Sequence, residues 1–324
     1  MGIVSFVSLK GGVGKTSLSI NVAHSFAERG CKTAVIDLDP TAHLTRLFSD
    51  KIDLNEGATL PHLLRMPLRY ENGSDSLVAG DGLIEQLSEF VNPFKEVRKN
   101  LFLVQGGEDL RHFLWGKGSK VWSSLFPKLI EEMSVEFDHI IIDTAPDFNV
   151  LSRNAIASSD LVCVPIDSSE MGIFGLKMIF EAAKHIKAPA WAVIRSMVNK
   201  SASRISALSM DSLNHNFSIT NESKDFLDQL RKFEEISDNN DVSVSYTPQV
   251  YLLNSFVQRT EQQNRLTFLK KTAFDLKLNQ KLANDYSQVA REVEGLMELE
   301  VELEEESEGY NIMQMLSERS QLTA

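Results

Sequence analysis

The glycine-rich stretch SLKGGVGKTS at residues 8–17 constrains the fold of this 324-residue chain more than any other feature. It follows an apolar run at residues 2–9 that predicts a buried strand, and it leads into a helical pattern at residues 16–30 that ends at a glycine. A strand, a glycine-rich turn and a helix that opens with Lys-Thr are the arrangement of a phosphate-binding loop. The chain is therefore expected to hold phosphate groups between its first strand and its first helix.

The residue types of this stretch match the parts of a nucleotide and its metal ion. Lys15 would bridge the β- and γ-phosphates, and the Thr16 hydroxyl would ligate Mg²⁺. Backbone N–H groups of the loop would surround phosphate oxygens, and the helix N-terminus would add positive charge. The alternative is a glycine-rich turn that carries a lysine by chance, but the position directly after a buried strand argues against it. The predicted nucleotide-binding residues here are Gly11, Gly12, Val13, Gly14, Lys15, Thr16 and Ser17.

Apolar runs of strand length alternate with amphipathic helical patterns along the rest of the chain. Continuous Ile/Val runs between such helices indicate a mainly parallel sheet that is covered on both faces. The expected fold class is therefore α/β, a doubly wound P-loop domain with helical insertions. After the first strand, the predicted strands are 32–39, 101–105, 139–145, 161–167, 190–198 and 250–257. After the first helix, the predicted helices are 109–116, 120–134, 149–158, 172–186, 260–273 and 280–297.

Two segments interrupt this alternation. Residues 50–100 carry several turn signals within a partly helical pattern, and residues 205–245 are polar and helix-prone. We interpret both segments as insertions in one domain that spans residues 1–297. An acidic tail at residues 298–324 would follow this domain.

The charge of the chain is unevenly distributed. The net charge is −12, but residues 292–308 hold nine glutamates and no basic residue. Residues 255–281, in contrast, are locally basic. The overall acidity therefore does not exclude a basic surface that binds nucleic acid.

The cellular setting is predicted from three further observations. The chain has no run of 18 apolar residues, so no membrane span is expected, and residues 1–12 lack the features of a signal peptide. Cys31 and Cys163 lie far apart within regular patterns, which argues for a reducing cytoplasm and against a disulfide or thiolate–metal framework. We interpret Cys31 as a loop thiol and Cys163 as a strand-packing thiol.

Lys10 is not explained by the common phosphate-loop pattern G-x-x-x-x-G-K-[ST], whose first position is Leu9 here. The variant K-G-G-x-G-K-[ST] resembles the deviant Walker A motif of the ParA/MinD ATPases. The resemblance implies that Lys10 reaches across a dimer interface to the phosphates of the partner's ATP, so that dimerisation depends on ATP. A γ-phosphate that faces a second subunit needs a cation, as an arginine finger supplies elsewhere. The alternative is a solvated loop lysine.

Two more segments carry the resemblance. The stretch VIDLDPTAHLT at residues 35–45 is similar to switch I of the family, which implies that Asp39 lies at the metal and positions the attacking water. Residues 137–179 follow the ParA pattern, which implies that Asp143 holds Mg²⁺ through water. The alternative for Asp143 is a carboxylate in a turn at a strand end. The resemblance thus implies a catalytic set of Lys10, Lys15 and Asp39 and a metal set of Thr16, Asp39 and Asp143.

The family resemblance also implies contacts with adenine and with DNA. Asn199 follows the strand at 190–198 and would contact the adenine ring, although a turn asparagine is the alternative. ParA dimers bind DNA without sequence preference through basic residues that contact phosphates. A solvated helix face is the alternative for these residues, and Gln258 stands where the family usually has proline. The expected DNA-binding residues are Arg204, Arg259, Arg265, Lys270 and Lys271.

The resemblance implies a weak ATPase that a ParB-like centromere-binding protein stimulates. It would dimerise on ATP, bind DNA non-specifically and drive plasmid or chromosome segregation, in the cytoplasm and on the nucleoid. Positioning of a protein cargo over the nucleoid is an alternative that shares every motif. A MinD-like positioner at a membrane surface is a further alternative, but the acidic C-terminus argues against membrane binding. Because a strand is predicted from residue 2, no helix-turn-helix is expected before the loop.

Overall fold

The computed structural model describes residues 1–49, 60, 94–167, 170–183, 185–186, 190–198, 249–260, 263, 266, 269–275 and 280–298. The described strands are β1 (Gly2–Phe6), β2 (Thr33–Leu38), β3 (Phe94–Arg98), β4 (Leu101–Val104), β5 (His139–Thr144), β6 (Leu161–Ile166), β7 (Ala190–Val198) and β8 (Gln249–Gln258). They form one sheet in the order β3-β4-β2-β5-β1-β6-β7-β8. Every neighbouring pair is parallel except β3 and β4, which confirms the predicted mainly parallel sheet.

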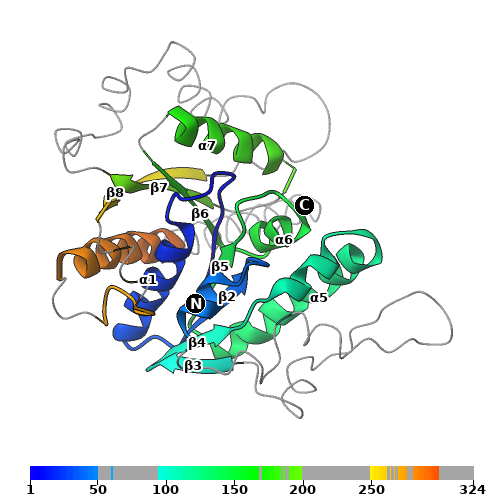
Figure 1. Ribbon diagram of the computed structural model, residues 1–324, viewed down its shortest axis with the longest axis horizontal. Coiled ribbons are helices and arrows are strands. Elements are labelled where there is room, and N and C mark those ends of the chain that lie inside the picture. The colour runs from blue at the N-terminus through cyan, green and yellow to red at the C-terminus, as the bar shows by residue number, and fades with distance from the viewer. Residues whose placement is uncertain are drawn as a thin grey trace, which may run out of the picture.

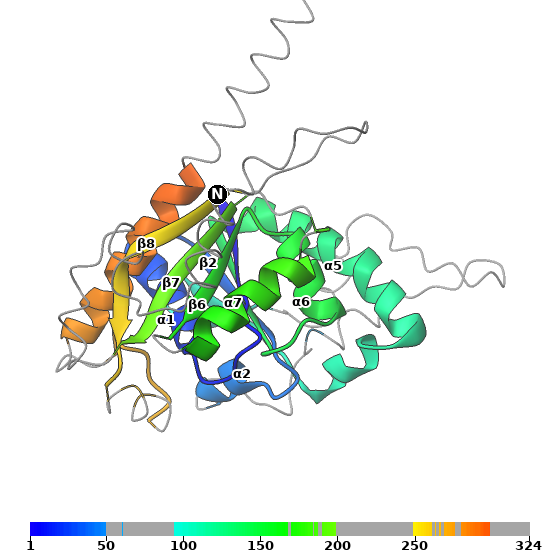
Figure 2. The same cartoon turned by 90° about the horizontal axis from the view of Figure 1, so that it is seen from above.

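Helices cover both faces of this sheet, as a doubly wound fold requires (Figure 1). The described helices are α1 (Lys15–Glu28), α2 (His43–Leu47), the 3₁₀ helix η1 (Glu108–Phe113), α5 (Gly116–Glu136), α6 (Val150–Ala157) and α7 (Glu170–Ala183). Residues 280–298 are also helical and pack with α1 on one face, whereas α5, α6 and α7 lie on the other (Figure 2). Among the described residues, no helix has both the length and the apolar character needed to cross a bilayer.

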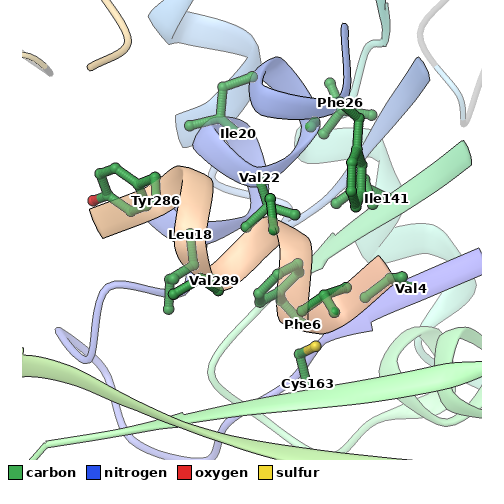
Figure 3. Packing of buried hydrophobic residues seen from close by; sticks show 14 of the residues in the cluster. Val4, Phe6, Leu18, Ile20, Val22, Phe26, Ile141, Cys163, Tyr286 and Val289 are labelled. Carbon is green, nitrogen blue, oxygen red and sulfur yellow. The ribbon is translucent and has the colours of Figure 1, made fainter. Parts of the chain in front are cut away.

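Alternation along the strands assigns side chains to the two faces. Ile141 of β5 packs in the cluster beneath α1 and residues 280–298 (Figure 3), whereas Ile140 and Ile142 pack beneath α5. Cys163 of β6 is fully buried in the first cluster, and burial raises the pKa of its thiol far above the usual range. The interpretation of Cys163 as a strand-packing thiol is therefore confirmed.

Strand β3 lies within residues 50–100, where only a partly helical connection was predicted, so that prediction was wrong for residues 94–98. The pattern FKEVR alternates buried side chains with more exposed ones, as a strand at the sheet edge does. Because its exposed residues are polar, it does not form the continuous apolar run that predicts a buried strand. Asn100, with φ of 61°, turns the chain back into β4. The remainder of that segment except residue 60, all of 205–245, and 299–324 lie outside the described residues.

Some predicted boundaries differ from the structure. Strand β1 ends at Phe6 rather than at residue 9, and residues 7 and 8 lead from the strand into the glycine-rich turn. The predicted helix at 109–116 is a 3₁₀ helix, and the next helix begins at residue 116 rather than 120. These differences leave the order of strands and helices in the chain unchanged.

Candidate nucleotide-binding site

The glycine-rich loop lies at the carboxyl edge of the sheet, between β1 and α1. Strand β1 is central, with β5 on one side and β6 on the other. The connection from β1 to β2 and the connection from β5 to β6 run in opposite directions across the sheet, so the strand order reverses at this point. In open α/β sheets, ligands bind at such a switch point beyond the carboxyl ends of the strands. Figure 2 shows the loop beside α2, on the opposite edge of the sheet from the N-terminus.

The loop backbone requires glycine at two positions. Gly12 and Gly14 have φ of 78° and 83°, in the left-handed region that other residues rarely adopt. Gly14 is also the N-cap of α1 and supplies no side-chain hydrogen bond to the first turn of the helix. The backbone N–H groups of that turn are therefore available to an anion.

Lys15 and Asp143 lie together beneath the loop. Lys15 is only 7% exposed, and Asp143, near the end of β5, is fully buried. The Ser19 hydroxyl lies 2.9 Å from Asp143 Oδ1 and 2.9 Å from the carbonyl oxygen of Lys15. Burial raises the pKa of Asp143 to about 6, although Lys15 and the hydroxyls of Thr16 and Ser19 act to lower it. The first turn of α1 thus surrounds this carboxylate with a cation and two hydroxyls.

The second oxygen of the Asp143 carboxylate is a candidate ligand of a metal ion. Its Oδ2 atom is buried and has no hydrogen-bond partner among the described residues. Buried carboxylate oxygens are normally satisfied, and Mg²⁺ prefers oxygen ligands of this kind. The donor set of Asp143 and the neighbouring Thr16 hydroxyl therefore fits Mg²⁺.

Asp37 holds the segment that follows β2. It pairs in register with Asp143 across β2 and β5, and burial and the charge of Asp143 raise its pKa to about 7. Its Oδ2 accepts hydrogen bonds from the Thr45 backbone at 2.8 Å and from the Thr45 hydroxyl at 2.7 Å. A Cβ atom at Gly106 would lie 2.3 Å from the Asp37 carbonyl oxygen, so only glycine fits there. Sequence reasoning missed both Thr45 and Gly106.

Asp39 lies at the start of the predicted switch I segment. The residue is only 8% exposed, and its Oδ1 accepts hydrogen bonds from the backbone N–H and the hydroxyl of Thr41 at 2.8 and 2.7 Å. Asp39 raises the pKa of Asp143 and that of Asp147, which shows that its charge acts on the same site. The three carboxylates Asp37, Asp39 and Asp143 therefore gather at the carboxyl edge of the sheet.

Lys10 makes an ion pair that the sequence did not indicate. Its Nζ lies 2.6 Å from Oδ2 of Asp167, and the two side chains are 30% and 28% exposed. Asp167 directly follows β6, so it is another acidic residue at a strand end. A Cβ atom at Gly172 would lie 2.5 Å from Asp167, so glycine lets α7 approach this pair. The two loop lysines therefore lie in different environments, one buried and one half-exposed.

The predicted adenine and DNA contacts are only partly described. Asn199, Arg204 and Arg265 lie outside the described residues. Arg259 is exposed, and its N–H donates to the Val198 carbonyl oxygen at 2.9 Å, beside the end of β7.

Lys270 and Lys271 are exposed, but they lie in a turn rather than on the predicted helix at 260–273. Lys270 has φ of 54°, and the Lys271 N–H donates to the Leu266 carbonyl oxygen. The following residues are held against α1 by a hydrogen bond from Ala273 N to Asn21 Oδ1 at 2.7 Å. This left-handed turn ends the helical pattern that the sequence predicted.

Comparisons with known proteins agree with this geometry. A family model described as an AAA domain matches residues 1–195. The chromosome-partitioning ATPase Soj of Treponema pallidum is 27% identical over 56% of this chain and 63% of its own length. The cell division protein PomZ of Myxococcus xanthus is 28% identical over 56% of this chain and 51% of its own length. This chain thus spans about half to two thirds of these relatives.

Solved structures share the fold over most of the chain. A candidate plasmid partition protein of Borrelia burgdorferi bound to AMPPNP is 19% identical, with a TM-score of 0.58 over 90% of this chain and 97% of its own. The MinC:MinD complex of Aquifex aeolicus gives a TM-score of 0.60 at 14% identity, over 91% of this chain and 96% of its own. The matched family model, these relatives and the phosphate loop together show that the chain belongs to the ParA/MinD family of P-loop ATPases.

Proposed function

We propose that this chain hydrolyses ATP as a nucleotide-dependent dimer that binds DNA non-specifically and serves plasmid or chromosome segregation. The observation that carries the proposal is the unequal placement of two lysines in one loop. Lys15 is buried beside Asp143, where it can neutralise phosphates of its own nucleotide. Lys10 is 30% exposed at the surface, where it can reach the nucleotide of a second copy.

The surface beside Lys10 also supports a dimer. Gly175 of α7 lies against the loop, since a Cβ atom there would be 3.8 Å from Lys10 Cβ. Met171, Phe174 and Met178 of the same helix are 63%, 56% and 44% exposed. Large apolar side chains that share one exposed face favour contact with a partner. A second copy would cover this face and bring its own Lys10 toward the loop.

Different residues of the chain would bind the phosphates, position the attacking water and hold the metal ion. Loop N–H groups and Lys15 orient and neutralise the phosphates, and Asp39 positions the attacking water. Thr16 and Asp143 would hold Mg²⁺, which when bound neutralises further phosphate charge. Lys10 of the second copy adds positive charge where the γ-phosphate leaves. Because this cation comes from the second copy, turnover is expected to depend on dimerisation. We also expect intrinsic turnover to be slow and to be stimulated by a partner protein such as a ParB-like factor.

The proposal is tested by DNA binding with and without ATP. Random-sequence duplex DNA should be shifted only when ATP is present, and log K should fall with log salt by about 0.9 per phosphate contact. Replacing Lys270 and Lys271 with glutamine should weaken binding and reduce this slope. Lys120→Gln on α5, on the opposite face of the sheet, is the matched control and should change neither quantity. A dimer that forms with ATP but does not shift DNA at low salt would instead favour positioning of a protein cargo.

A second prediction concerns Asp167, which holds Lys10 within its own chain. Asp167→Asn should remove this ion pair from Lys10 and strengthen ATP-dependent dimerisation. A half-exposed ion pair contributes about 0.2–1 kcal/mol, and two pairs open per dimer, so the dissociation constant should fall roughly 2- to 30-fold. Sedimentation analysis with a non-hydrolysable ATP analogue measures this constant, and Asp109→Asn at the surface of η1 is the control. An unchanged or weaker dimer would show that Asp167 does not compete for Lys10.

A further inference from the structure

The amino edge of the sheet, opposite the nucleotide site, brings together a thiol, an imidazole and a carboxylate. Cys31 precedes β2, His139 begins β5, and Glu294 lies in the helix at residues 280–298. One ligand atom from each side chain lies within 4.8 Å of the other two. Met297 of the same helix contacts Gly2, which confirms that the helix ends at this edge. The cluster shares no residue with the nucleotide site.

The His139 ring is held in place but is not satisfied. The residue is 8% exposed, and the ring stacks on Phe26 with centroids 4.3 Å apart. Its Nδ1 is buried and has no hydrogen-bond partner among the described residues, and its Nε2 lies 3.8 Å from Glu294 Oε1, beyond hydrogen-bond distance. Nε2 is therefore the nitrogen that would coordinate a cation beside Glu294, and Nδ1 would carry the ring proton.

The three donor atoms, a sulfur, a nitrogen and an oxygen, indicate which class of cation would bind. Thiolate, imidazole and carboxylate together are a ligand set of Zn²⁺, whereas Mg²⁺ and Ca²⁺ prefer oxygen alone. In tetrahedral Zn²⁺ sites, sulfur and nitrogen ligands lie about 3.5 Å apart, so the cluster must contract by roughly 1 Å. Cys31 and Glu294 are both half-exposed, which leaves their side chains room to move. Three protein ligands would leave a fourth position for water.

Neighbouring charges act on these groups in both directions: Glu294 and Asp138 raise the pKa values of Cys31 and His139, whereas Arg29 and the N-terminal amino group lower them. Arg29 Nη1 donates to Glu294 Oε2, which orients this carboxylate and leaves its Oε1 toward His139. A thiolate and a carboxylate together balance a dication. Burial lowers the pKa of His139, so its ring is neutral at neutral pH, as a metal ligand must be. Burial and the charge of Glu294 raise the pKa of Cys31, so metal binding must release the thiol proton, as coordination does at other sites.

The sequence argued against a thiolate–metal framework because it does not show which residues Cys31 meets in the fold. We propose that Cys31, His139 and Glu294 bind a Zn²⁺-class divalent cation that joins the helix at residues 280–298 to the amino edge of the sheet. The bound ion would stabilise this helix against the amino ends of β2 and β5. The site would act independently of ATP, because the sheet separates it from the phosphate loop (Figure 2).

Cobalt substitution tests the proposal. The full chain is titrated with Co²⁺ in saturating Mg·ADP, which keeps the metal out of the nucleotide site. One equivalent should produce a near-ultraviolet thiolate-to-cobalt band, and Zn²⁺ should displace it. The band should be lost in Cys31→Ser and kept in Cys163→Ser, the matched control with the other cysteine. Absence of the band in the wild type, or its persistence in Cys31→Ser, would overturn the proposal.

Two further measurements make the test independent of any one variant. Zn²⁺ should slow alkylation of Cys31 in the wild-type protein, and an unchanged rate would contradict coordination by this thiol. His139→Gln and Glu294→Gln should each weaken Zn²⁺ binding more than about 100-fold, since loss of outer partners alone costs 10- to 100-fold. His112→Gln is the control, because His112 forms an exposed pair with Asp109 elsewhere. Equal affinities in all variants would exclude the site.

Discussion

Lys15→Ala is expected to abolish measurable ATP binding. The lysine is buried at the first residue of α1, beside the fully buried Asp143, so water cannot replace its charge. Removing one partner of a buried, hydrogen-bonded charge pair costs about 2–5 kcal/mol, which is roughly 30-fold to several thousand-fold in affinity. Equilibrium titration with a fluorescent ATP analogue measures the change.

The same loop supplies the control for this experiment. Lys10→Ala removes an equal charge five residues earlier, and it should retain nucleotide affinity within a few-fold. Circular dichroism should show both variants folded, because Asp143, whose pKa is already raised to about 6, can become neutral when Lys15 is removed. If Lys15→Ala bound ATP as the wild type does, the assignment of the glycine-rich loop to phosphate would be wrong.

Lys10→Ala should in turn lose the ATP-dependent dimer. In the single chain this lysine pairs with Asp167 at the surface, so its loss leaves no buried charge behind and should not harm the fold. In the proposed dimer, however, it faces the γ-phosphate of the other copy, where no water replaces it. Light scattering with a non-hydrolysable ATP analogue should show a dimer for the wild type and a monomer for the variant.

Asp167→Asn is the matched comparison for Lys10→Ala. It alters the other member of the same ion pair, yet it should keep or strengthen the dimer. If both variants lost the dimer, the ion pair itself would stabilise the interface. A dimer of Lys10→Ala at wild-type concentrations would remove the role of this lysine in trans and would leave only the role of Lys15 in the loop.

Several parts of the fold could be predicted because their signals are local. The apolar runs that became β5 and β6 are continuous, since both faces of these strands are buried. The polar strand β3 escaped prediction, because an edge strand with one buried face resembles a loop. The turn at Lys270 was also missed, since the bond that holds the following segment to α1, from Ala273 N to Asn21 Oδ1, joins residues far apart in the sequence and is absent from any local pattern.

The amino-acid sequence by itself determined the phosphate loop and the alternation of strands and helices, because both depend on neighbouring residues. Only the tertiary structure decided which distant side chains meet. It paired Asp37 with Asp143 through strand register, gave Lys10 a partner 157 residues away, and left Asp143 Oδ2 without one among the described residues. Contacts between residues that are far apart in the sequence depend on the order of strands in the sheet. Strand order is fixed by packing over the whole domain rather than by any short stretch of chain.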